Sequence, residues 1–219
     1  LYVATRRAMW PLMGLAAGAG ASVVAYHLFD HVKRRVVAWK DPWGNYNDAG
    51  YQIAQSLFAI GTGGWLGMGL YQGIPDKIPV VKQDFIFSAI AEELGGIFAL
   101  CLILVCFSCF LMFMNIAMQM KDQFYKLVAL GLGTVYATQV FLTIGGATKF
   151  IPSTGVTLPL VSYGGSSLLC SMIIFAIIQG LYILRQDEGE QNEPKVRNYR
   201  KTGRKKTGFE KNNFKISDR

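Results

Sequence analysis

The feature that most constrains this chain is a series of five long apolar stretches separated by shorter polar segments. A bilayer's hydrocarbon core, about 30 Å thick, takes about 20 apolar residues in a helix. Of the 219 residues, 52% are hydrophobic and only 16% are charged. The sequence therefore predicts an all-α polytopic membrane protein, with about five transmembrane helices over residues 8–29, 51–70, 84–116, 127–144 and 168–184.

The second stretch, 51–70, is the least apolar of the five. Polar residues interrupt it and five glycines crowd its end, so we expect it to be buried among other helices rather than to face lipid. A phosphate-binding loop is excluded because the GxxxxGK[ST] order is absent and no strand precedes these glycines.

The third stretch begins with carboxylates. Asp84 stands where a polar loop becomes apolar, and Glu92 and Glu93 follow about two turns later, before an apolar run to Met114. Ionisable groups at the mouth of a membrane helix are costly and indicate function. Asp before an apolar helix is also a common N-cap, and spacing alone favours that structural role for Asp84. Glu92 and Glu93 are expected to pair with basic groups elsewhere in a longer protein.

Residues 145–167 are too apolar for a solvated loop and too rich in Gly and Pro for a regular helix. They predict a re-entrant or cavity-lining segment. We expect a membrane region over residues 1–184, truncated at its N-terminus because it begins with Leu1, and a disordered charged tail over 185–219.

The positive-inside rule predicts the orientation. With the basic tail in the cytoplasm, five spans also place the Lys33-Arg34-Arg35 and 121–126 loops there. Asp84, Lys149 and Tyr163 then lie on the outer face. Arg6 and Arg7 disagree with this assignment.

Four blocks, in this order, closely resemble the SEDS family (shape, elongation, division and sporulation) of FtsW, RodA and SpoVE proteins. They are Trp39-x-x-Pro42-Trp43, Gly50-Tyr51-Gln52-x-x-Gln55-Ser56, Asp84-Phe85-Ile86-Phe87 with Glu92-Glu93-Leu94-Gly95, and Pro152-x-Thr154-Gly155 with Ser162-Tyr163-Gly164-Gly165-Ser166-Ser167. The resemblance covers about residues 39–184. Whole members carry about ten spans of bilayer length, so the chain looks like a C-terminal half. It departs from the family at Gln83, where Thr or Ser is usual, and at Val80, where many members carry Glu.

The resemblance implies a peptidoglycan glycosyltransferase that polymerises lipid II into glycan strands, in cell division or elongation. Its catalytic aspartate matches Asp84, which would act as general base on the acceptor sugar's 4-hydroxyl. The expected substrate-binding residues are Lys77, Lys82, Lys149, Ser162, Gly164 and Gly165. No metal-ligating residues are predicted, and the only candidate cofactor is a divalent cation, Mg²⁺ or Mn²⁺.

The expected partners are lipid II, a class B penicillin-binding protein (a transpeptidase) and other divisome or elongasome membrane proteins, with no nucleic acid. The expected location is the bacterial cytoplasmic membrane, with the catalytic loop outside and the tail in the cytoplasm. Two alternatives stay open: a lipid II flippase or other transporter, which intramembrane carboxylates also suit, and a non-catalytic scaffold for the transpeptidase.

Overall fold

The computed structural model describes residues 9–47, 50–74 and 77–186, and in this part of the chain helices are the regular secondary structure, joined by turns and loops, with no strand. The predicted all-α class is confirmed. The tail predicted over 185–219 lies outside the described residues except for its first two. The helices are α2 (Met9–Leu28), α3 (Asp30–Lys40), α4 (Tyr51–Gly63), α5 (Ile86–Gln119), α6 (Gln123–Ala147) and the C-terminal helix Gly165–Gln186.

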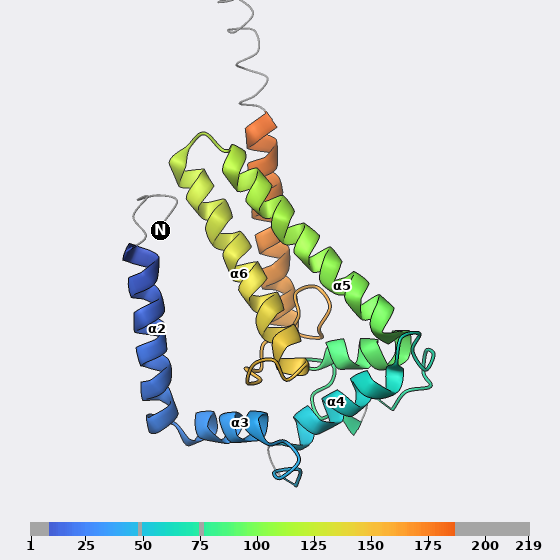
Figure 1. Ribbon diagram of the computed structural model, residues 1–219. Helices are drawn as coiled ribbons and strands as arrows, with labels where there is room; N and C mark the ends of the chain where they lie inside the picture. The colour runs from blue at the N-terminus through green and yellow to red at the C-terminus, as the bar shows by residue number, and fades with distance from the viewer. Residues whose placement is uncertain (1–8, 48–49, 75–76, 187–219) are drawn as a thin grey trace, which may run out of the picture.

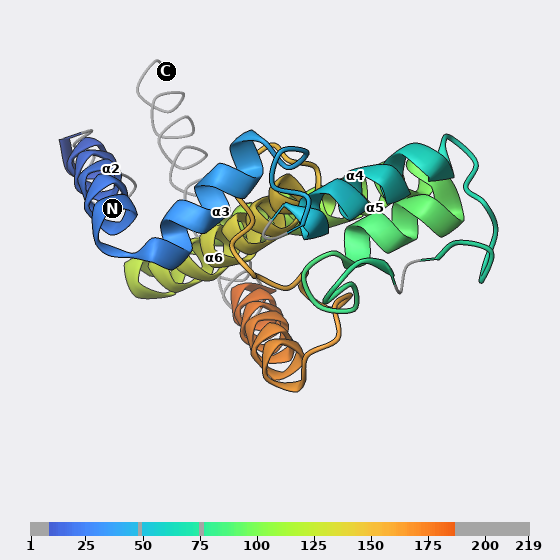
Figure 2. The same cartoon turned by 90° about the horizontal axis from the view of Figure 1, so that it is seen from below.

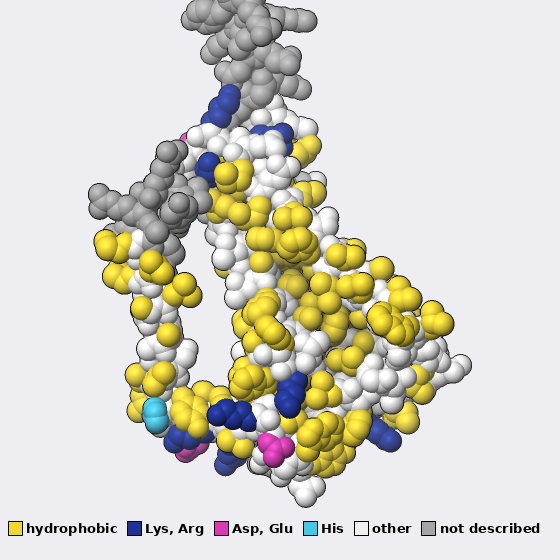
Figure 3. Space-filling model, in the orientation of Figure 1, with side chains coloured by type: hydrophobic (Ala, Val, Ile, Leu, Met, Phe, Trp, Pro, Cys, Tyr) yellow, Lys and Arg dark blue, Asp and Glu magenta, His cyan; other side chains and the backbone are white. Residues whose placement is uncertain are grey.

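Within the described residues, three helices are long and apolar enough to cross a membrane: α5, α6 and the C-terminal helix. They pack side by side in Figure 1, and the rings of Phe113, Tyr136 and Phe175, one from each helix, meet edge to face at centroid distances of 5.0–5.7 Å. Many large hydrophobic side chains on these three helices are exposed, and Figure 3 shows patches of hydrophobic side chains on the face turned to the viewer. An apolar outer surface of this kind suits a bundle surrounded by lipid.

A fourth span is possible only if α2 and α3 count together, since the chain bends by 101° between them. The predicted span over 51–70 is wrong. Its helix, α4, has 13 residues, too few for a bilayer that takes about 20. In Figure 1, α4 lies across one end of the bundle instead of along it.

Losing that span changes which segments share an end of the molecule. The start of α2, the α5–α6 turn and the end of the C-terminal helix lie at one end, and α3, α4 and the start of α5 lie at the other (Figure 1). Figure 2 looks onto this second end, where α3 and α4 follow one another across it. Because α4 does not cross the membrane, no span lies between Lys33-Arg34-Arg35 and Asp84. The prediction that they lie on opposite sides is therefore wrong.

Helix α5 is broken at Gly95, whose φ of 87° lies in the left-handed region that favours glycine. The glycine-rich loop after α4 supplies partners for the backbone groups freed by the break. Gly96 N–H donates to the Gly64 carbonyl (2.8 Å), and Met68 N–H donates to the Glu92 carbonyl (2.9 Å). A Cβ at Gly95 would collide with the backbone nitrogen of Gly67. Glycine is thus required at this contact between two backbones.

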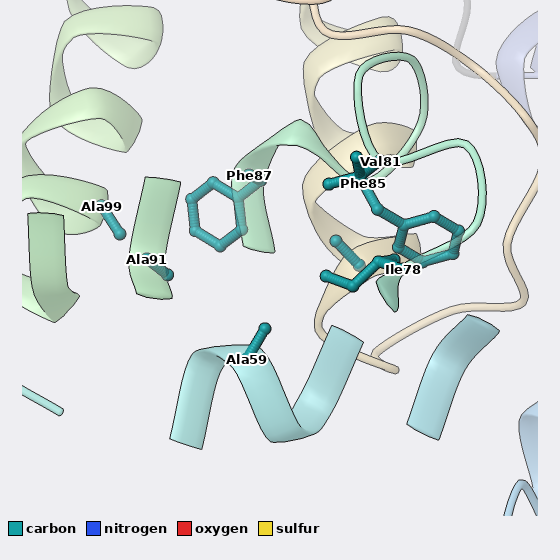
Figure 4. Close-up of a cluster of buried hydrophobic side chains, with 8 residues drawn as sticks. Ala59, Ile78, Val81, Phe85, Phe87, Ala91 and Ala99 are labelled. Atoms are coloured by element: carbon teal, nitrogen blue, oxygen red, sulfur yellow. The ribbon is translucent and has the colours of Figure 1, made fainter. Parts of the chain in front are cut away.

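The segment before Asp84 is held by a core of small and aromatic side chains (Figure 4). Ile78 and Val81 from this loop are buried in it, and Phe85 is only 1% exposed. Nearby, the Ser56 hydroxyl donates to the Ala147 carbonyl (2.8 Å) and bonds the Ser88 hydroxyl, which ties α4, α5 and α6 together. These contacts fix where Asp84 stands relative to α4 and α6.

Replacing Gly95 by alanine should destabilise the protein, because the added Cβ meets backbone atoms that cannot move aside. Strain at the positive φ alone costs about 1–3 kcal/mol. The matched control is Gly131→Ala in α6, where an added Cβ meets nothing within 4 Å. Thermal unfolding in detergent should show a lower midpoint for Gly95→Ala only, and equal midpoints for both variants would contradict the tight backbone contact.

Cysteines at Arg34, Tyr163 and Lys121, all exposed positions, test the arrangement of the ends. We expect Arg34→Cys and Tyr163→Cys to react with an impermeant maleimide from the same side of the membrane, because both lie at the Asp84 end. Lys121→Cys should react only from the other side. If Arg34→Cys and Lys121→Cys reacted from the same side of the membrane, the result would contradict this arrangement and support the five-span topology.

Candidate active site

Asp84 stands in a run of tight turns directly before α5. Its N–H and that of Gln83 both donate to the Val80 carbonyl, at 3.2 and 3.0 Å, and Phe85 occupies the N-cap position. No side-chain hydrogen bond caps this end of α5. The structural role that spacing alone favours for Asp84 is therefore absent, and the half-buried carboxylate is left free for another use.

Arg35 reaches the same region from α3. This helix begins with Asp30 in its first turn and ends with Lys40, before the helix-breaking Asp41-Pro42 step. Arg35 Nη1 donates to the Ser153 carbonyl at 3.1 Å, and Trp39 Nε1 donates to the Lys149 carbonyl at 3.0 Å. Two side chains one turn apart thus dock α3 on the loop that follows α6.

Gly155 brings the two charged groups to one point. A Cβ at this glycine would lie 3.5 Å from Asp84 Oδ2 and 3.5 Å from Arg35 Nη2. The Asp84 and Arg35 charges are nevertheless not a direct ion pair within 4.0 Å. The backbone of Gly155, with φ of 74°, lets the loop pass without filling the space between them.

Around this point lies a cavity of about 340 Å³ with a largely polar wall. It is lined by Arg35, Ala38, Gln52, Ile53, Asp84, Ser153 and Gly155. Gln52 comes from the first turn of α4, so α3, α4, the Asp84 turn and the 148–164 loop each contribute to the wall. A carboxylate, a guanidinium and an amide around one cavity suit a ligand that carries both hydroxyl and anionic groups.

Burial and the charge of Arg35 act in opposite directions on the pKa of Asp84. Burial raises the pKa of the Asp84 carboxyl above its ordinary value, and the Arg35 guanidinium nearby lowers that pKa by a smaller effect. Desolvation makes the carboxylate a stronger base, while the cation favours its ionised form. Both effects act on the proton affinity of the carboxylate, which is the property that a general base uses.

Side chains of α6 hold the 148–164 loop against that helix. Gln139 Nε2 donates to the Thr157 carbonyl (3.0 Å), and the Thr143 hydroxyl is within 2.9 Å of the Val156 carbonyl, to which it donates. The Tyr163 N–H donates to the Lys82 carbonyl at 2.8 Å, which joins this loop to the Asp84 turn. The predicted cavity-lining segment thus lines the cavity through Ser153 and Gly155.

Of the site residues predicted from the sequence, Asp84 alone lines this cavity. Lys77, Lys82 and Gly165 are exposed, while Lys149 and Gly164 are half-buried. The Ser162 hydroxyl is buried and accepts from the Leu158 N–H at 2.8 Å, as a turn-stabilising serine does. The substrate-binding roles of these six residues stay predictions.

Glu92 lies at the contact between α5 and the glycine-rich loop, and its pairing with basic groups elsewhere in a longer protein stays a prediction. It is buried; Oε1 accepts from the Ile74 N–H at 3.3 Å, and Oε2 has no hydrogen-bond partner among the described residues. Its carboxylate therefore ties the end of the glycine-rich loop to α5. No three His, Cys, Asp or Glu side chains gather closely enough in the described ranges to hold a metal, so the candidate divalent cation has no ready-made protein site there.

Sequence reasoning missed Arg35 and Gln52. Arg35 was placed with a basic loop on the far side, and Gln52 was read as an interruption of a span. The spacing of Gln52, Gln55 and Ser56 on one face of α4 could have indicated a polar, non-spanning helix. With α4 lying flat, the basic α3 must share the Asp84 end.

Comparison with known proteins gives a consistent result. Residues 1–186 match the model of the cell cycle protein family FtsW/RodA/SpoVE. The "Peptidoglycan glycosyltransferase RodA" of Mycobacterium tuberculosis is 43% identical over 178 residues, which are 81% of this chain and 38% of the relative. The "Probable peptidoglycan glycosyltransferase FtsW" of Saccharophagus degradans is 39% identical over 166 residues, 73% of this chain and 43% of the relative. The chain thus spans less than half the length of these relatives.

Replacing Arg35 by glutamine should raise the pKa of Asp84 further, because it removes the one charge among the described residues that lowers this pKa. On acidification, Asp84 would then take up its proton at a higher pH than in the unmodified protein. Infrared titration of the protonated carboxyl band, assigned by its loss in Asp84→Asn, measures this. Lys82→Gln, at an exposed lysine outside the cavity wall, is the control, and an unchanged or lowered pKa in Arg35→Gln would refute the coupling.

Proposed function

Since the chain belongs to the FtsW/RodA/SpoVE family, we propose that the protein is a peptidoglycan glycosyltransferase that polymerises lipid II at the Asp84 cavity. The observation that carries this proposal is that Asp84, directly before α5, and Arg35, on α3, both lie beside Gly155 without forming a direct ion pair. A base and an anion-binding cation across one cavity are the two groups that glycosyl transfer from a diphosphate donor requires. The names of the relatives support the same activity.

In the proposed reaction, the Asp84 carboxylate takes the proton of the acceptor sugar's 4-hydroxyl as that oxygen attacks C1 of the donor sugar. The bond between C1 and the diphosphate oxygen breaks, and the leaving polyprenyl diphosphate keeps the electron pair. Arg35 would hold this anion, because a guanidinium offers several N–H donors in one plane and, among the described residues, Arg35 donates only from Nη1, to the Ser153 carbonyl. Gln52 would orient a sugar hydroxyl or amide.

We also propose that the Asp84 end faces outward from the bacterial cytoplasmic membrane. The end of the C-terminal helix lies at the opposite end of the bundle and leads into the strongly basic sequence 195–206. Arg6 and Arg7 precede α2, which starts at that same end, so they now agree with the positive-inside rule, whereas Lys33, Arg34 and Arg35 on α3 at the Asp84 end oppose it. Lipid II and a class B penicillin-binding protein are the partners that this proposal implies.

The activity is tested with purified full-length protein and lipid II in liposomes. Glycan strands in the product support the glycosyltransferase. Exchange of lipid II between leaflets without strands would favour the flippase, and neither product would favour a scaffold for the transpeptidase.

Asp84→Asn should lower polymerisation on the order of 10²–10⁴-fold, because positioned acid–base catalysis contributes that much. Lipid II binding and thermal stability should change far less, since the Asp84 side chain caps no helix and the diphosphate contacts remain. The matched control is Asp41→Asn at the same end, where the carboxylate accepts the Gly44 N–H and an amide oxygen can replace it. Near-normal polymerisation by Asp84→Asn would end the assignment of Asp84 as the base.

A further inference from the structure

The loop that follows α4 turns its largest apolar side chains outward. Trp65 is 75% exposed, Leu66 is 84% exposed and Tyr71 is 94% exposed. Tyr71 adopts a φ of 62°, which residues other than glycine rarely adopt. No charged residue occurs anywhere from Ala49 to Pro75. An uncharged loop that displays aromatic and aliphatic side chains is unlike a water-facing loop and marks an interaction surface.

Hydrogen bonds hold this loop beside the start of the membrane-crossing part of α5. The Gly96 N–H donates to the Gly64 carbonyl at 2.8 Å, and the Ile97 N–H donates to the Trp65 carbonyl at 3.2 Å. Gly96 and Ile97 form the first turn after the break at Gly95. Trp65 therefore lies beside the point where α5 begins to cross, as Figure 1 shows for the teal loop at the bend of α5.

The surface next to Trp65 continues along α5 without a polar break. Ile97, Phe98 and Leu100 are exposed apolar side chains in the first turns of a candidate membrane span. In a spanning helix these side chains require lipid or protein around them. The exposed apolar side chains of the loop therefore continue into the part of the α5 surface that faces the apolar part of the bilayer.

We propose that the loop over residues 65–71 is an interfacial anchor, embedded among the phospholipid headgroups and upper acyl chains of the leaflet on the Asp84 side. Trp and Tyr are enriched at this depth because their rings are apolar and carry one polar group. The loop is tied through Ile74 to Glu92, and further along the chain Ile78 is buried in the same core as Phe85, the residue after Asp84. Anchoring Trp65 would hold the Asp84 cavity at a fixed height above the acyl chains.

The test uses the emission of Trp65 itself. Full-length protein and its Trp65→Phe variant are placed, without other proteins, in nanodiscs of phosphatidylcholine that is brominated on the upper acyl carbons or unbrominated. The emission lost on going from the parent to Trp65→Phe belongs to Trp65. We expect this difference emission to peak at shorter wavelength than tryptophan in water and to lose most of its intensity in the brominated nanodiscs.

Trp39→Phe is the matched comparison, because the half-buried Trp39 donates to the Lys149 carbonyl and should be quenched little. Unquenched Trp65 emission at long wavelength would mean a loop in water, and unquenched emission at short wavelength would mean a loop covered by protein. Either result overturns the proposal.

A nitroxide at Leu66→Cys, with the native cysteines replaced by alanine, gives a second measurement that leaves Trp65 intact. It should be more accessible to oxygen than to a charged nickel chelate, and Lys77→Cys should show the reverse. Equal preference for the nickel chelate at both positions would also overturn the anchor.

Discussion

The broken helix α5 is the constraint on which the rest of this structure depends. In a bilayer, backbone N–H and C=O groups have no water to bond, so an unpaired break would cost several kcal/mol for each free group. The glycine-rich loop satisfies the break at Gly95 by direct backbone hydrogen bonds on both sides of it. The chain before Gly95 is thereby free to run across the end of the bundle, and Asp84 stands at the start of that crossing layer.

The same layer explains why a charged cavity exists at this end. With α4 lying flat, α3 is also kept at the Asp84 end, and Arg35 docks on the Ser153 carbonyl rather than on Asp84. A direct Arg35–Asp84 ion pair would lower the basicity of the carboxylate. Docking on a carbonyl leaves both groups available to a ligand, and the positive φ of Gly155 keeps the space between them open.

Much of the fold follows from the sequence, because apolar length sets the membrane helices and Gly and Pro content sets the irregular segment, which covers 148–164 of the predicted 145–167. Asp84 is proposed as the base through the family resemblance, since spacing alone cannot separate a helix cap from a base. The span over 51–70 was wrong because composition does not reveal that its glycines serve a broken helix elsewhere in the chain. That error placed Arg35 on the wrong side, and since cavities depend on contacts between distant segments, Gln52 and Gly155 were missed as wall residues.

The most direct test of this account is the position of the substrate's diphosphate in a structure of the full-length protein. The Asp84→Asn variant with bound lipid II would trap the complex before transfer. We expect the diphosphate against the Arg35 guanidinium, with the sugar end within hydrogen-bonding reach of residue 84. A diphosphate bound instead at Lys149 and the Gly164-Gly165 backbone, away from Arg35, would contradict the assignment of this cavity.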